Sequence, residues 1–524
     1  MICRRILVYE IIETYMLSHL RNRFTQWSAS PTVRHFYARA IWVLTAVCVV
    51  CAAVLSVYML VMRFAHLSNG LQYDELYSAV TASPKFSFIY TFKNMLLYDI
   101  NLPLFNFMLW CWNRIFPFTS FWMHLFSSLF AAGAVVAAWV CAPKYWSNLK
   151  KWIFVSLMAC SFVLVVYAFI VRAYSFSVLA TTVFSLYALR FIHQFSEGKA
   201  PSKKDWLIFF TVGLLGAYSH YFCTAEFFIT ALVVFLYACY YKIGRAWAFW
   251  GTAVVFALLS GWLIYVINGL MHTDSSAWWY TIPKTKATYE IIIFLFGSQQ
   301  LFAFVLYGLV VALVSFGFTY KKEFFKQADM VLPLAQIGLL LGVVALISLR
   351  YNLWMDRYFL PAMPALLLLL AQCFEHLRQR HGVLLVLWPI LLVCWVKAYW
   401  GQEHLHWPEY TGLHDAFVHL IEYRKADKVL VAYERSGYPE AALIPMFEFY
   451  VPEDKKIEFI PFTEQTAPMA WSTDPKLPIL MPICSQMHLI HTSLHTHTEE
   501  DGMPNLFLHD VCVYTAHPIW GRGK

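Results

Sequence analysis

Charged residues are scarce in this chain of 524 residues. Asp, Glu, Lys and Arg make up 13% of it, which is about half the share found in soluble globular proteins. In contrast, 60% of the residues are hydrophobic and 18% are aromatic. This composition excludes a water-soluble enzyme. It indicates an integral membrane protein built as one large helical bundle, with room for one smaller domain.

The sequence also lacks three signals that would change its classification. The first 39 residues hold no short apolar core with a small-residue cleavage site, so the first apolar segment is expected to be an uncleaved anchor. No Asn-x-Ser/Thr sequon occurs, which favours a bacterial protein. No repeat relates the two halves of the chain, whereas many transporters contain one.

Cysteine and histidine show no pattern of a disulfide-rich or zinc-binding domain. Most of the twelve cysteines, such as Cys160, lie in apolar runs and behave as small hydrophobic side chains. Cys484 and Cys512 lie in the polar C-terminal region and could pair if that region is extracytoplasmic. The histidine-rich segment 488–497 lacks zinc-ligand spacing and predicts a solvated loop.

The formal net charge of +8 does not predict a nucleic-acid partner. Most lysines and arginines lie in short loops between apolar runs, where positive charge orients a polytopic protein. We therefore expect the chain to bind a lipid bilayer and no nucleic acid.

Eleven apolar runs are long enough to cross a bilayer, which takes about 17–25 residues. They lie at 40–62, 121–142, 151–171, 173–195, 205–222, 223–241, 245–269, 290–318, 331–349, 357–376 and 383–400. A further stretch, 102–118, is short and contains Asn106, Asn113 and Arg114. If it does not cross, about 20 basic residues lie in inner loops and about 9 in outer loops; if it crosses, these numbers become about 12 and 17. The first arrangement is expected, with 102–118 as an interfacial helix.

This arrangement predicts an all-α polytopic membrane bundle in a bacterial inner membrane. Residues 1–39 would be cytoplasmic and 40–400 would form the transmembrane domain, whose first outer loop spans 63–120. The active site would face the periplasm.

The composition of the sequence changes after residue 400, where the long apolar runs end. Strand-like runs at 428–433, 456–462 and 510–516 are separated by proline and polar loops. They predict a small α/β domain over 401–524. With eleven crossings, this domain and the C-terminus would lie in the periplasm.

Charged and aromatic residues gather in the predicted outer loops. The first loop carries the adjacent acids Asp74 and Glu75 in the sequence LQYDELYSAV. The later loops carry Arg172, Tyr174, His220, Tyr221, Lys284, Arg357 and Tyr358. Tyr, Trp and Lys at an interface are more often anchors than ligands. Arg172 differs, because it lies between two apolar runs with almost no loop, where a charge is costly unless something compensates it.

These residue types predict a site for phosphate and proton transfer. Arginine binds phosphate bidentately and stays charged, and a carboxylate can accept a proton from a hydroxyl group. Arg172, Arg357 and Lys284 would stabilise a lipid-phosphate leaving group. One acid of the pair, Asp74 or Glu75, would act as the general base, and the other would support it through position or charge. Together they describe sugar transfer from a lipid-phosphate carrier.

The order of these motifs resembles the polytopic glycosyltransferases of the GT-C fold, in the branch of protein O-mannosyltransferases and the aminoarabinose transferase of lipid A. The pair Asp74-Glu75 matches the acidic pair of their first outer loop. Further matches are Pro103-Leu104, Arg172-Ala173-Tyr174, His220-Tyr221, and Arg357-Tyr358 followed by Pro361 and Pro364. The likeness covers roughly residues 40–380.

The resemblance implies a polyprenyl-phosphate sugar donor, an acceptor hydroxyl on the outer side and inversion at the anomeric carbon. It also implies that Asp74 is the acid nearest the reaction. The substrate would contact Tyr174, His220, Tyr221 and Tyr358.

The sequence departs from the family pattern at two places. Leu102 replaces the first proline of the usual pair, and the acid that often follows Arg-x-Tyr is absent from RAYSFSVLATT. Some relatives use a divalent cation such as Mg²⁺ or Mn²⁺, which needs several oxygen ligands. Without that acid we expect no obligatory metal, although Glu75 could serve as a second ligand.

Two other functions compete with sugar transfer from a lipid phosphate. A transporter or lipid flippase would place charges near the membrane midplane, whereas here they gather at one face. A transferase similar to O-antigen ligases would use a lipid diphosphate and a large late loop, whereas here the acids come early. The sequence identifies neither the sugar nor the acceptor, which could be a protein, lipid A or another glycan.

Overall fold

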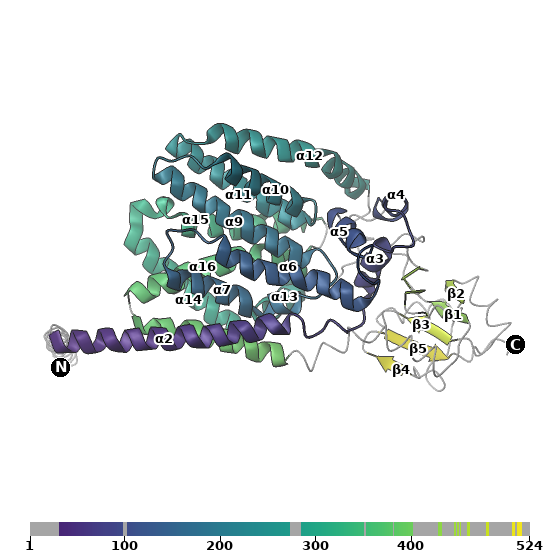
Figure 1. Ribbon diagram of the computed structural model, residues 1–524, viewed down its shortest axis with the longest axis horizontal. Coiled ribbons are helices and arrows are strands. Elements are labelled where there is room, and N and C mark those ends of the chain that lie inside the picture. Colours follow the sequence, from purple (N-terminus) through teal and green to yellow (C-terminus); the bar gives the residue numbers. More distant parts are fainter. Residues whose placement is uncertain are drawn as a thin grey trace, which may run out of the picture.

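The computed structural model describes residues 31–97, 102–272, 284–350, 353–380 and 382–401, and short segments between 428 and 515. The described helices form one bundle, and a small sheet lies beyond the end of the bundle that is distant from the N-terminus (Figure 1).

Nine helices in this part of the chain are long and apolar enough to cross a membrane. They are α2 (Pro31–Met62), α6 (Ser120–Val140), α9 (Tyr174–Ser196), α11 (Tyr221–Tyr241), α12 (Arg245–His272), α14 (Gln299–Tyr320), α15 (Ala328–Ile347), α16 (Met363–Arg380) with the preceding η4 (Asp356–Ala362), and the segment Gly382–Gly401, which begins with η5 (Gly382–Val386). The two other predicted runs form shorter helices: α7 (Asn148–Cys160) with α8 (Phe162–Val166), and α10 (Lys203–Ala217). The predicted polytopic helical bundle is confirmed.

The run 151–171 is not one continuous helix. Ser161 has φ −54° and ψ 118° and separates α7 from α8. The guanidinium of Arg63 closes the end of α7, because it donates to the carbonyl oxygens of Met158 at 2.8 Å and Ala159 at 2.6 Å. Arg63 is 1% exposed. Its buried charge is compensated by the negative end of the helix dipole.

The run 290–318 also divides, at Gly297 between α13 (Lys284–Phe296) and α14. Gly297 has φ +86°, and a Cβ at this position would lie 2.5 Å from the Cβ of Ala398. Only glycine adopts this backbone conformation freely and permits such a close approach. The helix therefore stops and restarts here.

The segment 102–118 does not form a membrane-crossing helix. Its helical part, α5 (Leu104–Trp112), has nine residues and is about 14 Å long, about half the thickness of the hydrocarbon core. The same end of the bundle holds α3 (Tyr73–Thr81), α4 (Phe88–Thr91) and the π-helix η1 (Phe92–Leu96) (Figure 1). The predicted segment therefore contains a short helix, and its position at the membrane interface stays a prediction.

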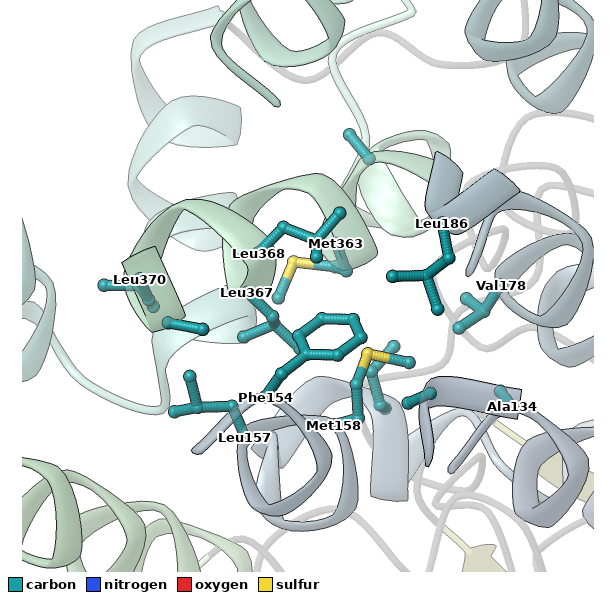
Figure 2. Packing of buried hydrophobic residues seen from close by; sticks show 14 of the residues in the cluster. Ala134, Phe154, Leu157, Met158, Val178, Leu186, Met363, Leu367, Leu368 and Leu370 are labelled. Carbon is teal, nitrogen blue, oxygen red and sulfur yellow. The ribbon is translucent and has the colours of Figure 1, made fainter. Parts of the chain in front are cut away.

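The centre of the bundle is a continuous apolar core between α7, α9 and α16. Phe154 and Met158 of α7 face Met363 and Leu367 of α16, and Leu186 of α9 lies beside them (Figure 2). All five side chains are at most 2% exposed. This packing fixes the helices that carry the polar residues at their ends.

The predicted outer loops meet at one end of the bundle. We name this the site end; it comprises α3, α5, the turn 167–173, His220 and η4. The predicted inner loops meet at the opposite end, where Tyr145 and Lys150 bind Asp329. The grouping of the loops agrees with the predicted alternation, and their orientation across the membrane stays a prediction.

The C-terminal segments form a five-stranded mixed sheet in the order β2-β1-β3-β5-β4. The strands are β1 (Lys428–Val431), β2 (Glu458–Pro461), β3 (Pro478–Met481), β4 (Leu506–Leu508) and β5 (Val511–Thr515). β1 pairs in parallel with β2 and β3, whereas β5 is antiparallel to β3 and β4. The three predicted strand-like runs correspond to β1, β2 and β5. The exact start of the domain after residue 400 lies outside the described residues and stays a prediction.

The C-terminal region packs against the first loop at the site end. Val429 and Met446 belong to the same buried cluster as Leu71, Leu76 and Phe105. The ring of Phe449 meets that of Phe118 edge-on at 5.4 Å. The C-terminal sheet and the predicted outer loops therefore lie on the same side of the bundle.

Candidate active site

Helix α3 places both acids of the Asp74-Glu75 pair in its first turn. The backbone N–H of Gln72, the N-cap, donates to Oε2 of Glu75 at 2.8 Å. This bond closes the helix start, and the positive end of the helix dipole favours acids at these positions. Asp74 and Glu75 are neighbours on the helix, so their side chains point to different surroundings.

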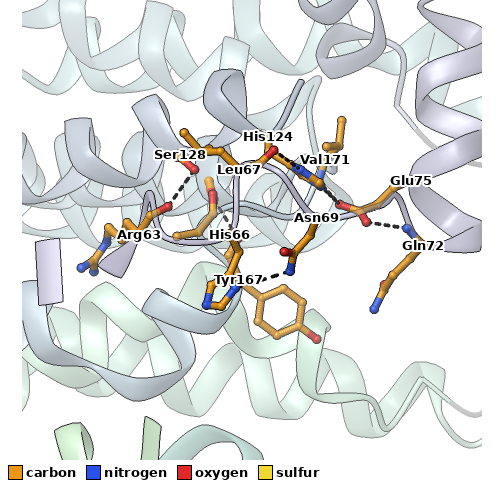
Figure 3. A network of polar contacts seen from close by, with 12 residues as sticks. Arg63, His66, Leu67, Asn69, Gln72, Glu75, His124, Ser128, Tyr167 and Val171 are labelled. Atoms are coloured by element: carbon orange, nitrogen blue, oxygen red, sulfur yellow. Dashed lines mark hydrogen bonds and ion pairs between the residues drawn. The ribbon is translucent and has the colours of Figure 1, made fainter. Parts of the chain in front are cut away.

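Glu75 points into the protein and is 0% exposed (Figure 3). Its Oε1 accepts the backbone N–H of Val171 at 2.6 Å and lies 3.5 Å from Nε2 of His124. The turn 167–173 is non-helical, so its buried N–H groups need partners outside the helix ladder. Glu75 supplies one of them and thereby attaches α3 to this turn.

Asp74 points toward η4 and forms an ion pair with Arg357. The distance from Oδ2 to Nη1 is 2.9 Å, and the side chains of Asp74 and Arg357 are 33% and 20% exposed. Arg172 also contacts this residue: its Nη1 donates to the carbonyl oxygen of Asp74 and to Oγ of Ser78, both at 3.3 Å. One carboxylate and two guanidinium groups from three separate elements thus lie together.

Aromatic side chains border this group. The ring of Tyr174 lies 5.8 Å from that of His220, which lies 6.3 Å from Tyr358. Tyr167 meets Tyr174 edge-on at 5.1 Å, and its hydroxyl donates to Asp356 at 2.7 Å. Three of the four predicted substrate-binding residues are therefore close to one another.

A pocket shares two of these aromatic residues. It is lined by Arg63, Ala131, Ala134, Val135, Met158, Leu164, Tyr167, Tyr174, Ser175, Val178 and Leu360. Most of the lining is apolar, and Arg63, the tyrosines and Ser175 add hydrogen-bonding groups. The aromatic border of the ion pair is therefore also the wall of a pocket inside the bundle.

Two predicted site residues have other contacts. The hydroxyl of Tyr221 accepts a hydrogen bond from Nε1 of Trp262 on α12 at 3.3 Å. The ammonium of Lys284 donates to the carbonyl oxygen of Ser348 at the end of α15, at 2.7 Å. Within the described ranges, no ion pair joins Lys284 to Asp74.

Residues that could hold a metal do not gather in the described part of the chain. No group of three or more His, Cys, Asp or Glu side chains there could bind a metal ion. Both oxygens of Glu75 already accept backbone hydrogen bonds. The expectation of no obligatory divalent cation stays a prediction.

Sequence reasoning missed His124 and Tyr167, which both contact predicted site residues. Each lies inside an apolar run, where a single polar side chain is easily attributed to the core. Only their position near a helix end could have indicated a role at the site. His124 comes four residues after α6 begins, and Tyr167 ends the helical part of the run 151–171.

Some predictions lie outside the described residues. They concern Cys484, the side chain of Cys512, the histidine-rich segment 488–497 and most of the loop 271–289.

No protein-family model matches the sequence, and no curated protein matches it significantly. The structure matches crystal structures of ArnT from Cupriavidus metallidurans. The apo form gives a TM-score of 0.53 and 11% identity over 90% of this chain and 99% of ArnT. The form bound to undecaprenyl phosphate gives 0.51 and 11% over 90% and 97%. The chain therefore shares the fold of ArnT, a GT-C-like fold, and the resemblance is confirmed at the level of fold.

Proposed function

We propose that this protein is a membrane-embedded inverting glycosyltransferase that moves a sugar from a polyprenyl-phosphate carrier to an acceptor hydroxyl. The observation that carries the proposal is the Asp74–Arg357 pair at 2.9 Å with Arg172 beside it. These groups lie at the loop-rich end of a fold shared with a protein crystallised with undecaprenyl phosphate. A lipid phosphate supplies the anion that two adjacent guanidinium groups attract.

In this reaction, negative charge grows on the leaving phosphate, and the acceptor hydroxyl loses a proton. The site contains groups for both changes. Arg172 and Arg357 bind the phosphate, and they stabilise the negative charge that grows when the bond from the anomeric carbon to the phosphate oxygen breaks. Asp74 accepts the proton of the acceptor hydroxyl, whose oxygen forms the new bond to the anomeric carbon. Attack opposite the leaving phosphate inverts the anomeric centre. The products are the glycosylated acceptor and polyprenyl phosphate.

The aromatic residues bind the sugar in this proposal. Tyr174, His220 and Tyr358 offer ring faces and hydrogen-bonding groups beside Asp74. Tyr221 and Lys284 contribute at the edges, Lys284 by adding positive charge near the lipid phosphate. The acceptor, whether protein, lipid A or another glycan, approaches from the side of the first loop.

We also propose that the site end faces the periplasm from a bacterial inner membrane. The positive-inside distribution supports this orientation, because basic residues predominate in the loops of the opposite end. Lys199, which is exposed at that end, should stay unlabelled when Lys199→Cys cells receive an impermeant thiol reagent. Labelling from outside above the wild-type background would reverse the orientation and the proposed direction of transfer.

Sugar transfer is tested directly with the purified full-length protein in lipid nanodiscs. Synthetic polyprenyl-phosphate sugars are offered with membrane extracts as acceptors, and release of polyprenyl phosphate and glycosylated product are both measured. Glycosylated product that forms with the wild-type protein, and not without protein, supports the proposal. Movement of the intact lipid between leaflets without bond cleavage would instead identify a flippase, and activity only with lipid diphosphates would identify the ligase-like alternative.

A further inference from the structure

Glu75 and His124 form a buried pair that connects three segments of the site end (Figure 3). Both side chains are 0% exposed, and Oε1 of Glu75 lies 3.5 Å from Nε2 of His124. The same oxygen accepts the N–H of Val171 at 2.6 Å. His124 comes from α6 and is held on its other side, because its Nδ1 lies 3.2 Å from the carbonyl oxygen of Leu67. We name the contacts among these four residues the Glu75 clamp.

The geometry of the clamp restricts which of its atoms can act as donors. The carbonyl oxygen of Leu67 can only accept, so Nδ1 of His124 carries a proton. A neutral ring would then turn the lone pair of Nε2 toward the Glu75 carboxylate, at a place closed to water. The 3.5 Å contact lacks hydrogen-bond geometry, and as an ion pair it is attractive only when the two groups share one proton beyond the proton on Nδ1. The pair then has no net charge, which a buried pair of ionisable groups requires.

The clamp adjoins both charged groups of the proposed reaction. Asp74 precedes Glu75 in the chain, and Arg172 follows Val171. Direct contacts between Asp74 and Arg172 are long, since Nη1 of Arg172 lies 3.3 Å from the carbonyl oxygen of Asp74. The bond from Val171 to Glu75 is much shorter, at 2.6 Å. The separation of Asp74 and Arg172 is therefore set mainly by the clamp.

We propose that His124 is a positioning residue for sugar transfer: it neutralises Glu75, and the neutralised carboxylate holds Asp74 and Arg172 at the separation that the reaction needs. This inference rests on the proposed function. It assigns Glu75 a supporting role in place of proton transfer to substrate. A misplacement of about 1 Å in a reacting group can lower a rate about 10²-fold.

Three variants test the inference by kinetics. His124→Leu should lower kcat about 10²-fold while the KM for donor changes less than about threefold, because the arginines still bind phosphate but Asp74 is misaligned. His124→Gln keeps an N–H that can face Glu75, so it should retain most activity. Glu75→Gln combined with His124→Leu should have a kcat about tenfold above that of His124→Leu, because an uncharged amide needs no neutralising partner. Its single amide oxygen can still accept from Val171, while the bond from Gln72 is lost.

A matched control separates positioning from a general effect of losing a histidine. His193 lies 3.3 Å from Glu197 at the opposite end of the bundle, and both side chains are partly exposed. His193→Leu removes the same kind of pair and should leave kcat and KM unchanged. Protein yield and thermal unfolding are measured for every variant.

Amide hydrogen exchange of the full-length protein in nanodiscs without donor provides a readout that is independent of activity. In His124→Leu, exchange of the Val171 amide should rise about tenfold or more, and the double variant should restore protection. Unchanged exchange at Val171, a rise in KM at constant kcat, or a double variant no better than His124→Leu would each overturn the inference. If the wild-type protein transfers no sugar, the proposed function fails, and exchange still decides whether His124 holds the turn.

Discussion

The two ends of the bundle each contain an ion pair, and the two pairs are built differently. At the opposite end, Lys150 lies 2.7 Å from Asp329, donates to Gln372 and lies 4.4 Å from the ring centroid of Trp146. Asp329 also accepts from Tyr145 at 2.7 Å. The side chains of Lys150 and Asp329 are only 6% and 18% exposed.

At the site end, the Asp74–Arg357 pair is more open. Its side chains are 33% and 20% exposed, and its neighbours come from helix ends and a non-helical turn. A pair enclosed by its own hydrogen-bond partners joins helices and has no room for a ligand. A partly exposed pair beside a second arginine can exchange its internal contact for a phosphate. The difference in enclosure distinguishes a structural pair from a candidate active site.

The largest expected effect is the loss of the Asp74 carboxylate. Asp74→Asn preserves the shape of the side chain but cannot accept a proton, so turnover should fall about 10²–10⁴-fold. Asp329→Asn is the matched control, and it should reduce stability while turnover per folded molecule stays unchanged. Transfer rates from a synthetic donor are measured together with folded protein. Near-normal turnover in Asp74→Asn would remove its role as general base, and a greater loss in Glu75→Gln would exchange the roles of the two acids.

Removing Lys150 should affect stability more than activity. Lys150→Ala leaves the largely buried Asp329 carboxylate without its cation, which should lower the free energy of unfolding by about 3–5 kcal/mol. Replacing both partners, as Lys150→Met with Asp329→Leu, should recover most of this loss. Equilibrium unfolding in detergent measures both variants. If Lys150→Ala is as stable as the wild type, the enclosed pair is not the structural joint that its contacts indicate.

Arg172 and Arg357 should affect donor binding. Arg172→Ala and Arg357→Ala should each weaken binding of the lipid-phosphate donor by about 2–5 kcal/mol. Lysine at either position should recover only part, because the bidentate fork is lost. Arg190, whose guanidinium donates to the carbonyl oxygens of Val140 and Ala142 at the opposite end, provides the control Arg190→Ala. Equal donor affinity in the wild type and both alanine variants would contradict the assignment.

The smallest effect concerns the contact between the C-terminal region and the first loop. Phe449→Ala removes an edge-on ring contact with Phe118. It should lower the free energy of unfolding by about 0.5–1.5 kcal/mol beyond the loss from apolar burial. We expect faster amide exchange in α3 and little change in donor affinity. If amide exchange becomes faster only near residue 449 and is unchanged in α3, the C-terminal region does not support the site.

The sequence is sufficient to predict the elements that depend on composition and periodicity. Long apolar runs determine the spans, and charge bias indicates which loops share an end, so the amino-acid sequence alone predicts that Asp74, Arg172 and Arg357 lie on one side of the membrane. The Glu75 clamp was not predictable, because His124 and Val171 meet Glu75 only through the tertiary fold. The helix breaks at Ser161 and Gly297 also escaped prediction, since hydrophobicity reports the length of an apolar run and not its backbone path.

The contact between the C-terminal region and the first loop has a consequence for biosynthesis. Leu71 and Leu76 leave the ribosome early, whereas Met446, which shares their buried cluster, is made after the nine candidate spans of the described residues. Contacts so distant along the chain form late in folding. The apolar surface of the first loop around Leu71 and Leu76 therefore stays uncovered until the bundle has been inserted and the Met446 segment has been made. In an unfinished chain, this surface would be accessible to chaperones and proteases.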